Sequence, residues 1–166
     1  MFIIGDKVVH PMHGAGIIES IVTEKVGGAY HDYYVFKMPM NGLVLKIPTN
    51  NADAIGIRPL DSCEQIETVF CMLPQLSSDM NHNWNRRYRE NLAHLKSGDL
   101  MEVASVIKGL MCRDTARGLS TGERKMLYIA KQILISVVCL AEDTDFKSVE
   151  QRINDAVYAS AERKGS

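Results

Sequence analysis

Residues 7–48 read KVVHPMHGAGIIESIVTEKVGGAYHDYYVFKMPMNGLVLKIP, and this stretch decides the fold of the first third of the chain. Short β-branched and aromatic runs alternate there with turn sequences, including Gly27-Gly28 and Asn41-Gly42. Both central residues of a type I′ hairpin turn need positive φ, which glycine and asparagine adopt readily. The pattern therefore predicts antiparallel strands at residues 6–9, 15–25, 30–38, 42–48 and 56–59.

Short consecutive strands of this kind cannot bury an apolar face alone. They need a second packing surface or closure into a barrel. We predict a small antiparallel β-barrel of the Tudor or SH3 type over residues 1–60.

The hydrophobic period changes after residue 60. Ile66, Val69, Phe70 and Leu73 recur at helical spacing behind Ser62, a candidate N-cap, which predicts a helix over 62–73. The following LPQLSSDMNHN is rich in Pro, Ser and Asn and is typical of a linker. We assign residues 61–80 to this helix and linker.

The remainder of the chain has the period of helices, predicted at 84–97, 99–115, 120–140 and 145–160. The third of these opens with an S-x-x-E capping box, Ser120 to Glu123. The fold class is therefore α+β by two modules, with an all-α domain over 81–160 and a flexible tail over 161–166.

Composition narrows the class of protein. The 166 residues are 46% hydrophobic and 23% charged, which is typical of soluble globular chains. No apolar run is long enough for a membrane span and no signal peptide is recognisable, so we expect a cytoplasmic protein without membrane contact. Four cysteines without a C-x-x-C pair predict buried free thiols.

Catalytic and metal-binding motifs are not recognisable in the sequence. His10 and His13 form an H-x-x-H, but they flank Pro11 in a predicted turn and have no third ligand spaced nearby. We expect a protein that is not an enzyme and that has neither a metal site nor a cofactor.

Charge is unevenly distributed along the chain. Residues 79–131 hold ten Lys/Arg against six Asp/Glu, whereas both flanking segments are acidic and the whole chain has a net charge of -1. An anionic partner should therefore meet the middle segment, with weak and sequence-independent DNA binding at physiological salt.

The stretch NHNWNRRYRENL, residues 81–92, places the only tryptophan beside three arginines. On a helical wheel Trp84 lies in one stripe with Tyr88, which permits the interpretation that Trp84 is core and the arginines a solvated face. With Asn83 as N-cap, however, Trp84 occupies the first helical position and could project from the tip. Both interpretations remain open at this point.

In the second interpretation the helix start binds DNA. The unpaired amides of a helix N-terminus attract phosphate, and arginines beside an apolar wedge resemble the way architectural proteins enter a minor groove. The predicted phosphate contacts are Arg86, Arg87 and Arg89, with Arg124 and Lys125 in the first turn of the third predicted helix of the all-α module.

These blocks together resemble the CarD/CdnL family of bacterial transcription regulators. The likeness runs from GDKVVHPMHGAGIIESI through DYYVFKMP and LVLKIPTNNADAIGIRPL to NWNRRYRENLAHLKSGD and RDTARGLSTGERKMLYIAKQIL, in the family's order and spacing. It implies a Tudor-like RNA-polymerase-interacting domain, related to one in the transcription-repair coupling factor, that docks on the polymerase β subunit. It also implies a helical domain that contacts promoter DNA.

The resemblance implies roles for individual residues. Trp84 matches a tryptophan wedged into the minor groove at the upstream edge of the open bubble, Arg86 and Arg89 match basic DNA contacts, and Arg124 and Lys125 match another basic pair. Arg87 matches less well because its angle on the wheel differs.

In the β module, Lys46 of LVLKIP stands where the family has an arginine that contacts the polymerase, two residues after Val44. Glu24 departs from a position that is basic in some members. Lys25 beside it could substitute, although adjacent strand residues face opposite sides.

The sequence thus leaves two functions: a regulator that stabilises the open complex with a tryptophan wedge, or a protein–protein adaptor without one. We expect a monomer, and association of two copies through an exposed β edge stays open.

Overall fold

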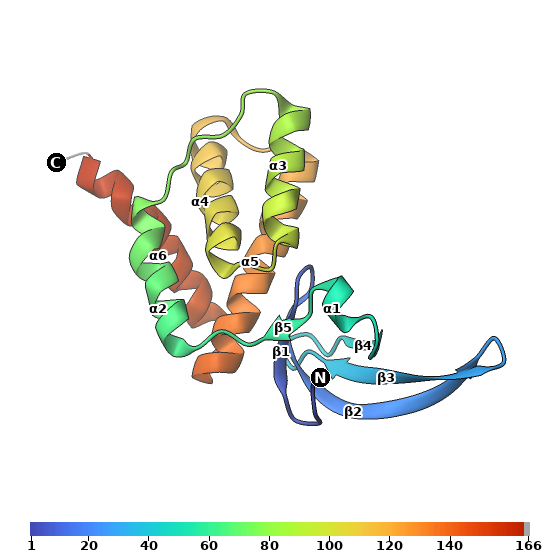
Figure 1. Cartoon of the computed structure of the whole chain (residues 1–166). Coiled ribbons are helices and arrows are strands. Elements are labelled where there is room, and N and C mark those ends of the chain that lie inside the picture. The colour runs from blue at the N-terminus through green and yellow to red at the C-terminus, as the bar shows by residue number, and fades with distance from the viewer. Residues whose placement is uncertain (165–166) are drawn as a thin grey trace.

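The computed structural model describes the backbone of residues 1–164 and the side chains of residues 1–159. Figure 1 shows a β module at one end of the molecule and a group of helices above it. The strands are β1 Lys7–His10, β2 Gly14–Val26, β3 Ala29–Lys37, β4 Val44–Pro48 and β5 Arg58–Pro59. The helices are α1 Ala52–Ile55, α2 Cys63–Met72, the 3-10 turn η1 Leu73–Gln75, α3 Trp84–Lys96, α4 Leu100–Arg117, α5 Thr121–Glu142 and α6 Phe146–Lys164.

The five strands form one antiparallel sheet in the order β4-β3-β2-β1-β5. This confirms the α+β class and a Tudor-like module. The sheet is not closed, however, because β4 and β5 lie at opposite edges of it. A barrel would have covered the edge of β4, whose backbone groups on one side instead remain open to a partner.

The turns explain where the predicted strand limits were wrong. Gly27 and Gly28 have φ of 62° and 84°, as the hairpin between β2 and β3 requires. In the next turn only Gly42 has positive φ, and the side chain of Asn41 accepts a hydrogen bond from the Leu43 amide instead. Because this turn is longer than a two-residue loop, β4 starts at Val44 and not at residue 42.

One short helix was not predicted, and the last helix is longer than expected. Helix α1 has four residues and ends at Ile55, followed by the C-cap Gly56 with a φ of 95°, so the strand expected at 56–59 is shortened to β5. A single helical turn is too short for hydrophobic periodicity to reveal it. At the other end of the chain, α6 continues to Lys164, beyond residue 161 where a tail was predicted, and residues 165–166 lie outside the described residues.

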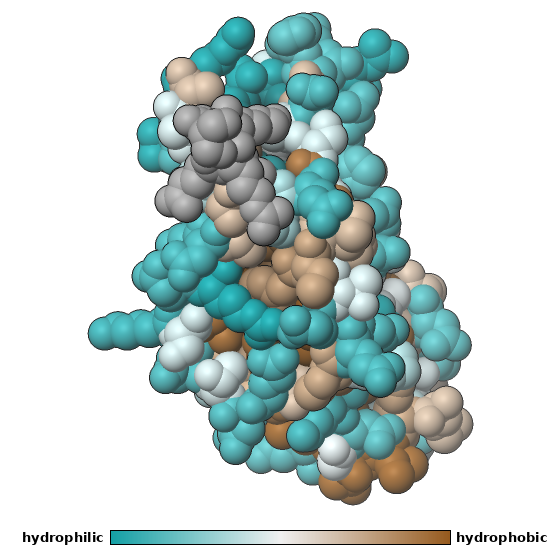
Figure 2. Space-filling view, turned by 90° about the vertical axis from the view of Figure 1, so that its left-hand side faces the viewer, coloured by the Kyte–Doolittle hydropathy of each residue, from teal (hydrophilic) through white to brown (hydrophobic). Residues whose placement is uncertain are grey.

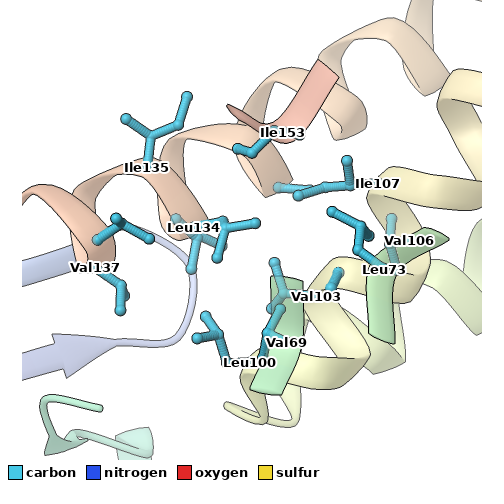
Figure 3. Packing of buried hydrophobic residues seen from close by; sticks show 14 of the residues in the cluster. Val69, Leu73, Leu100, Val103, Val106, Ile107, Leu134, Ile135, Val137 and Ile153 are labelled. Atoms are coloured by element: carbon cyan, nitrogen blue, oxygen red, sulfur yellow. The ribbon is translucent and has the colours of Figure 1, made fainter. Parts of the chain in front are cut away.

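Alternation along β1 divides the molecule into two cores. Val8 packs in a β core with Tyr34, Phe36 and Met38. Its neighbour Val9 faces the other way, into the larger core made by the helices. Figure 3 shows that larger core, where side chains from α2, η1, α4, α5 and α6 converge, among them Leu73, Ile107, Leu134 and Ile153.

Helix starts agree closely with the sequence because caps are local. Ser62 caps α2 with a full capping box, since its hydroxyl accepts from the Gln65 amide and the Gln65 side chain accepts from the Ser62 amide. Asn83 caps α3, and Asp99 caps α4. Each cap satisfies a backbone N–H that the helix itself cannot.

A buried hydrogen bond joins the two modules. The backbone N–H of Ala15 in β2 donates to Oγ of Ser136 in α5 at 2.9 Å. Gly14 is needed at this contact, because a Cβ there would overlap Ser136 Oγ and its φ of 108° disfavours other residues. Helix α5 is therefore held directly against the sheet.

The surface carries several large apolar side chains. Figure 2 shows one face that is mostly hydrophilic, with hydrophobic residues near its middle and at its lower end. Exposed large apolar residues of the β module include Ile21, Val26, Tyr30 and Val44. No helix within the described part of the chain is long and apolar enough to cross a membrane. All four cysteines are free, but Cys63 and Cys71 are exposed and not buried as predicted.

Candidate nucleic-acid interface

The first turn of α3 presents Trp84 at the tip of the helical module. The side chain of Asn83 accepts from the Arg86 amide at 3.0 Å, so the helix begins at Trp84 as predicted. The Trp84 residue is 42% exposed, which overturns the interpretation of Trp84 as core. Its ring stacks on Tyr88, one turn later, with centroids 5.1 Å apart and an interplanar angle of 17°.

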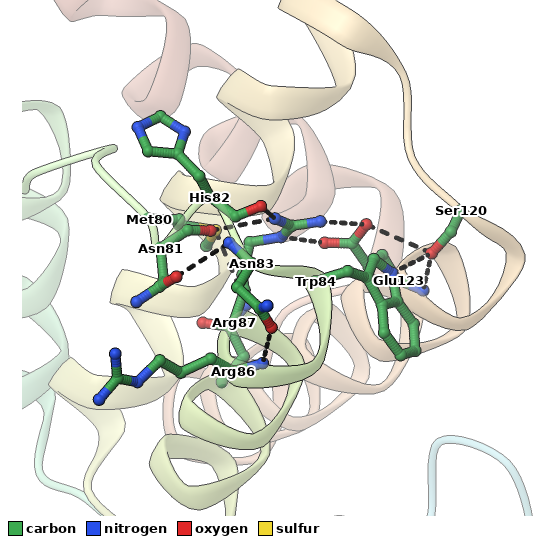
Figure 4. A network of polar contacts seen from close by, with 10 residues as sticks. Met80, Asn81, His82, Asn83, Trp84, Arg86, Arg87, Ser120 and Glu123 are labelled. Atoms are coloured by element: carbon green, nitrogen blue, oxygen red, sulfur yellow. Dashed lines mark hydrogen bonds and ion pairs between the residues drawn. The ribbon is translucent and has the colours of Figure 1, made fainter.

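The same indole is also bound to α5. Its Nε1–H donates to Oγ of Ser120 at 3.0 Å (Figure 4). Trp84 lies over the first turn of α5, where a Cβ on Gly122 would stand 3.6 Å from Cζ2 of the ring. Trp84 is therefore neither buried nor free: one face and one edge contact the protein, and the rest is open to solvent.

Arg87 does not belong to the exposed surface, which corrects its prediction as a DNA contact. The residue is 2% exposed, and its Nε and Nη2 donate to the carboxylate of Glu123 at 2.8 and 3.2 Å. Its Nη1 donates to the carbonyl oxygens of Asn81 and His82 at 3.0 and 3.3 Å. Four of its five N–H donors are bonded inside the protein and the side chain is buried, so Arg87 does not offer its charge to a phosphate.

Glu123 is buried as deeply as Arg87 and serves two partners. Besides the ion pair, its Oε1 accepts from the Ser120 hydroxyl at 3.2 Å, while its backbone N–H donates back to Ser120 Oγ. Burial raises the pKa of Glu123, but the hydrogen bonds and charge of Arg87, the Ser120 hydroxyl and the charge of Arg113 together hold that pKa below 4.5. The predicted capping box is thus half formed, because the Glu123 side chain turns to Arg87.

The other predicted cations are exposed and lie on different sides of the tip. Figure 4 shows Arg86 extending from α3 in the direction away from Trp84. Arg124 and Lys125 are exposed on the first turn of α5, the turn over which Trp84 lies. Arg89 is exposed on the second turn of α3. The accessible ring therefore has positive side chains on both sides of it, as phosphate contacts across a groove would require.

Two further arginines at this end were not singled out from the sequence. Arg113 and Arg117, near the end of α4, line a cavity of about 260 Å³ together with His82 and Asp79. The only feature of the sequence that pointed to these two arginines was their position in the basic segment, residues 79–131. The total charge of that segment is larger than the positive charge at its surface, because Lys108 is 3% exposed and donates to the carbonyls of Pro74 and Val157.

The β module carries the residues expected to meet a protein partner. Val44 and Lys46 are both exposed on the edge strand β4. Ile47, the residue after Lys46, is buried. The ammonium of Lys46 forms an ion pair with Glu24 of β2 across the outer face. Glu24, an acidic residue at a position that is basic in some members, is therefore the ion-pair partner of Lys46.

Lys25 does not join this group. It stands opposite Tyr30 in the β2–β3 ladder, with its Nζ 5.8 Å from the centre of the Tyr30 ring. Alternation places this pair on the sheet face opposite to Glu24 and Lys46. Lys25 is exposed, but it faces away from Glu24 and Lys46, so a polymerase contact by Lys25 stays a prediction.

His10 and His13 lie together in the β1–β2 turn, with ring centroids 4.5 Å apart. His10 Nδ1 accepts from the Met12 amide, which leaves it no free lone pair there for a metal. Burial, and then the neighbouring His13, lower the pKa of His10 to about 4. No group of three or more possible metal ligands occurs among the described residues.

Comparison with known proteins gives a consistent result for both modules. Residues 2–61 match a family model described as the CarD-like/TRCF RID domain, and residues 68–154 match one described as the CarD C-terminal domain. A protein of Bacillus subtilis (strain 168), named "Putative transcription factor YdeB", is 35% identical over 136 residues, which cover 82% of this chain and 89% of that protein.

Proposed function

This chain belongs to the CarD family of transcription regulators, and we propose that it binds the RNA polymerase β subunit and stabilises the promoter open complex through a Trp84 wedge. Trp84 would enter the minor groove at the upstream edge of the melted bubble. The family is one of regulators and not of enzymes, so the proposed activity is a change in an equilibrium and not a reaction.

The observation that carries the DNA part of this proposal is the accessibility of Trp84. A flat apolar ring stands at a helix N-terminus, 42% exposed, with Arg86 on one side and the first turn of α5 on the other. Minor-groove proteins insert apolar side chains between base steps and contact the flanking phosphates with basic ones. We assign phosphate contacts to Arg86, Arg89, Arg124 and Lys125, and none to Arg87.

The polymerase part is supported by the open edge of the sheet. Domains of the CarD-like/TRCF RID type interact with RNA polymerase in general. An exposed strand such as β4 offers unpaired backbone groups to a partner strand, while Val44 and Lys46 on its outer face would select the partner. The same edge could pair with a second copy, but we propose the polymerase as its partner and a monomeric regulator.

The joint between the modules lets the two contacts work together. Ser136, which holds β2, and Ser120, beside Trp84, lie on the same helix, about 24 Å apart along its axis at 1.5 Å per residue. Because α5 is one continuous helix, docking of the β module would present Trp84 at a fixed place. Tethering of this kind raises the local concentration of DNA and compensates for weak intrinsic affinity.

The energetic requirement is a difference between two states of the promoter. A factor that binds closed and open promoter equally shifts nothing, whereas one that fits only the unstacked junction favours the open state. Each ~1.4 kcal/mol of such preference changes the ratio of open to closed complexes about tenfold. The polymerase has already unstacked the junction, so the wedge need not supply that energy.

The test is the lifetime of the open complex formed by the cognate polymerase, with no factor, with wild type, with Trp84→Ala and with Lys46→Glu. We expect wild type to lengthen the lifetime. Trp84→Ala should lose most of that effect while it still binds polymerase, and Lys46→Glu should lose the binding itself. If wild type does not change the lifetime although it binds polymerase, the protein is an adaptor without a wedge and the proposal fails.

A further inference from the structure

We propose that Ser120 is a positioning residue for the wedge: its hydroxyl holds the Trp84 indole in the orientation in which it meets DNA. This inference rests on the proposed function and adds to it a residue that contacts no DNA. It assigns the buried Arg87–Glu123 pair the task of fixing Ser120. Figure 4 shows the whole chain of contacts, from Arg87 through Glu123 and Ser120 to Trp84.

The Ser120 hydroxyl has no freedom left. It donates to Oε1 of Glu123 at 3.2 Å, and it accepts from the Glu123 amide at 3.2 Å and from the indole N–H of Trp84 at 3.0 Å. A hydroxyl has one donor and two acceptor positions, and all three are in use. Because the hydroxyl hydrogen points to the carboxylate, the two lone pairs must face the Glu123 amide and the indole N–H.

The Glu123 carboxylate is itself immobile. Arg87 binds both of its oxygens, and the third nitrogen of the same guanidinium is bound to the carbonyls of Asn81 and His82. Arg87 and Glu123 are each 2% exposed. A bidentate pair in this setting keeps one geometry, so the linker before α3 and the first turns of α3 and α5 hold the Ser120 oxygen in place.

The indole is then bounded on three sides. Tyr88 covers one face, Ser120 binds the N–H edge, and Gly122 lies beside the benzene ring, where a Cβ would stand 3.6 Å from Cζ2. What remains exposed is the surface that a base step can meet. An aromatic side chain that is ordered before binding does not lose rotamer freedom when it binds, which is the general advantage of preorganisation.

The experiment uses the fact that the chain has one tryptophan, so one indole resonance reports on Trp84 alone. In ¹⁵N-labelled full-length protein we expect the wild-type indole N–H to exchange slowly and to show a rigid heteronuclear NOE. In Ser120→Ala the indole N–H should exchange faster with solvent, and its heteronuclear NOE should indicate a mobile ring. In the open-complex assay, the open complex formed with Ser120→Ala should have a lifetime about two- to tenfold shorter than with wild type. Polymerase binding should be unchanged.

Two matched variants separate positioning from helix capping. Ser62→Ala removes an equivalent N-cap hydroxyl from α2, far from Trp84 in the fold, and should change neither the indole signal nor the lifetime. Ser120→Thr retains a hydroxyl and should restore both. If Ser62→Ala shortens the lifetime as much as Ser120→Ala does, the effect is one of stability and the inference is wrong.

The remaining outcomes are also decisive. An indole signal in Ser120→Ala that equals wild type would show that the hydroxyl does not hold the ring. A mobile indole with an unchanged or longer lifetime would show that the contact does not position the wedge, even where Trp84→Ala shortens the lifetime. If Trp84→Ala itself has no effect, the proposed function fails together with the inference, and the NMR result then describes only a structural contact.

Discussion

Arg87 and Glu123 are 36 residues apart in sequence and form a two-pronged ion pair with Nε–Oε2 at 2.8 Å and Nη2–Oε1 at 3.2 Å. The pair joins the first turns of α3 and α5, the two turns that carry Trp84 and the accessible cations. A buried pair adds little net stability compared with apolar residues, but breaking it leaves an uncompensated charge. Its importance is therefore geometric.

Arg87→Met should destabilise the protein by about 3–5 kcal/mol, because it leaves the Glu123 carboxylate buried without a cation. Urea denaturation followed by circular dichroism measures this. Arg86→Met, which changes an exposed arginine next to it, is the control and should cost less than about 1 kcal/mol. Adding Glu123→Leu to Arg87→Met should recover part of the loss; strict additivity of the two changes would contradict a direct pair.

Acidification should release the same pair. The pKa of Glu123 lies below its ordinary 4.5 in the folded protein, so the unfolded chain binds the proton more readily. The stability from this group is complete above pH 4.5 and is lost as the pH falls through the lower folded value. Denaturation between pH 6 and 3 should show this loss in wild type and a smaller one in Glu123→Gln. Equal losses would locate the acid sensitivity elsewhere.

His10 should produce a second pH dependence in a higher range. Its pKa is lowered from 6.5 to about 4, mainly by burial and also by His13, so the unfolded chain takes up the proton first as the pH falls. The stability that neutral His10 contributes is complete above pH 6.5 and declines as the pH falls toward 4. Thermal unfolding at pH 7 and pH 5 should differ more for wild type than for His10→Gln. The exposed His31→Gln is the control and should behave as wild type.

Glu24→Gln should strengthen polymerase binding, by at most about fivefold, because the Lys46 ammonium loses its partner within the chain and becomes available to another. Titration of labelled protein with polymerase, at two salt concentrations, measures the change. Glu19→Gln removes an exposed carboxylate at the nearby β-bulge and serves as the matched change in net charge. A gain that is equal for both variants would be a general charge effect and not the release of Lys46.

Ser136→Ala should loosen the joint between the modules. It leaves the buried N–H of Ala15 without its partner, at a cost of about 1–3 kcal/mol in unfolding free energy. Ser105→Ala is the matched control, because among the described residues that hydroxyl bonds only to the Met101 carbonyl of its own helix. Open-complex lifetime should fall in Ser136→Ala while polymerase binding persists. If the lifetime is unchanged, the two modules need not be held rigidly.

Local features were predictable from the sequence because their causes are local. The caps Ser62, Asn83 and Ser120 were recognisable, since a short polar side chain reaches only the amides two or three residues ahead. The strands of the β module were recognisable by their short β-branched and aromatic runs and by the turn sequence Gly27-Gly28. Helix α1 was missed because four residues are too few for a periodic pattern.

The sequence by itself determined the two modules, their order, the start of the helix that presents Trp84 and the likeness to the CarD family. Only the tertiary structure decided which cations are accessible, because a helical wheel gives the direction of a side chain but not what it meets. Arg87 meets Glu123 and is withdrawn from the surface, and Lys46 meets Glu24. Trp84 meets Ser120, and the ring that could have been core or a free tip is instead held half exposed. Such contacts link residues 22 to 36 positions apart, and their pairing depends on how whole helices and strands pack.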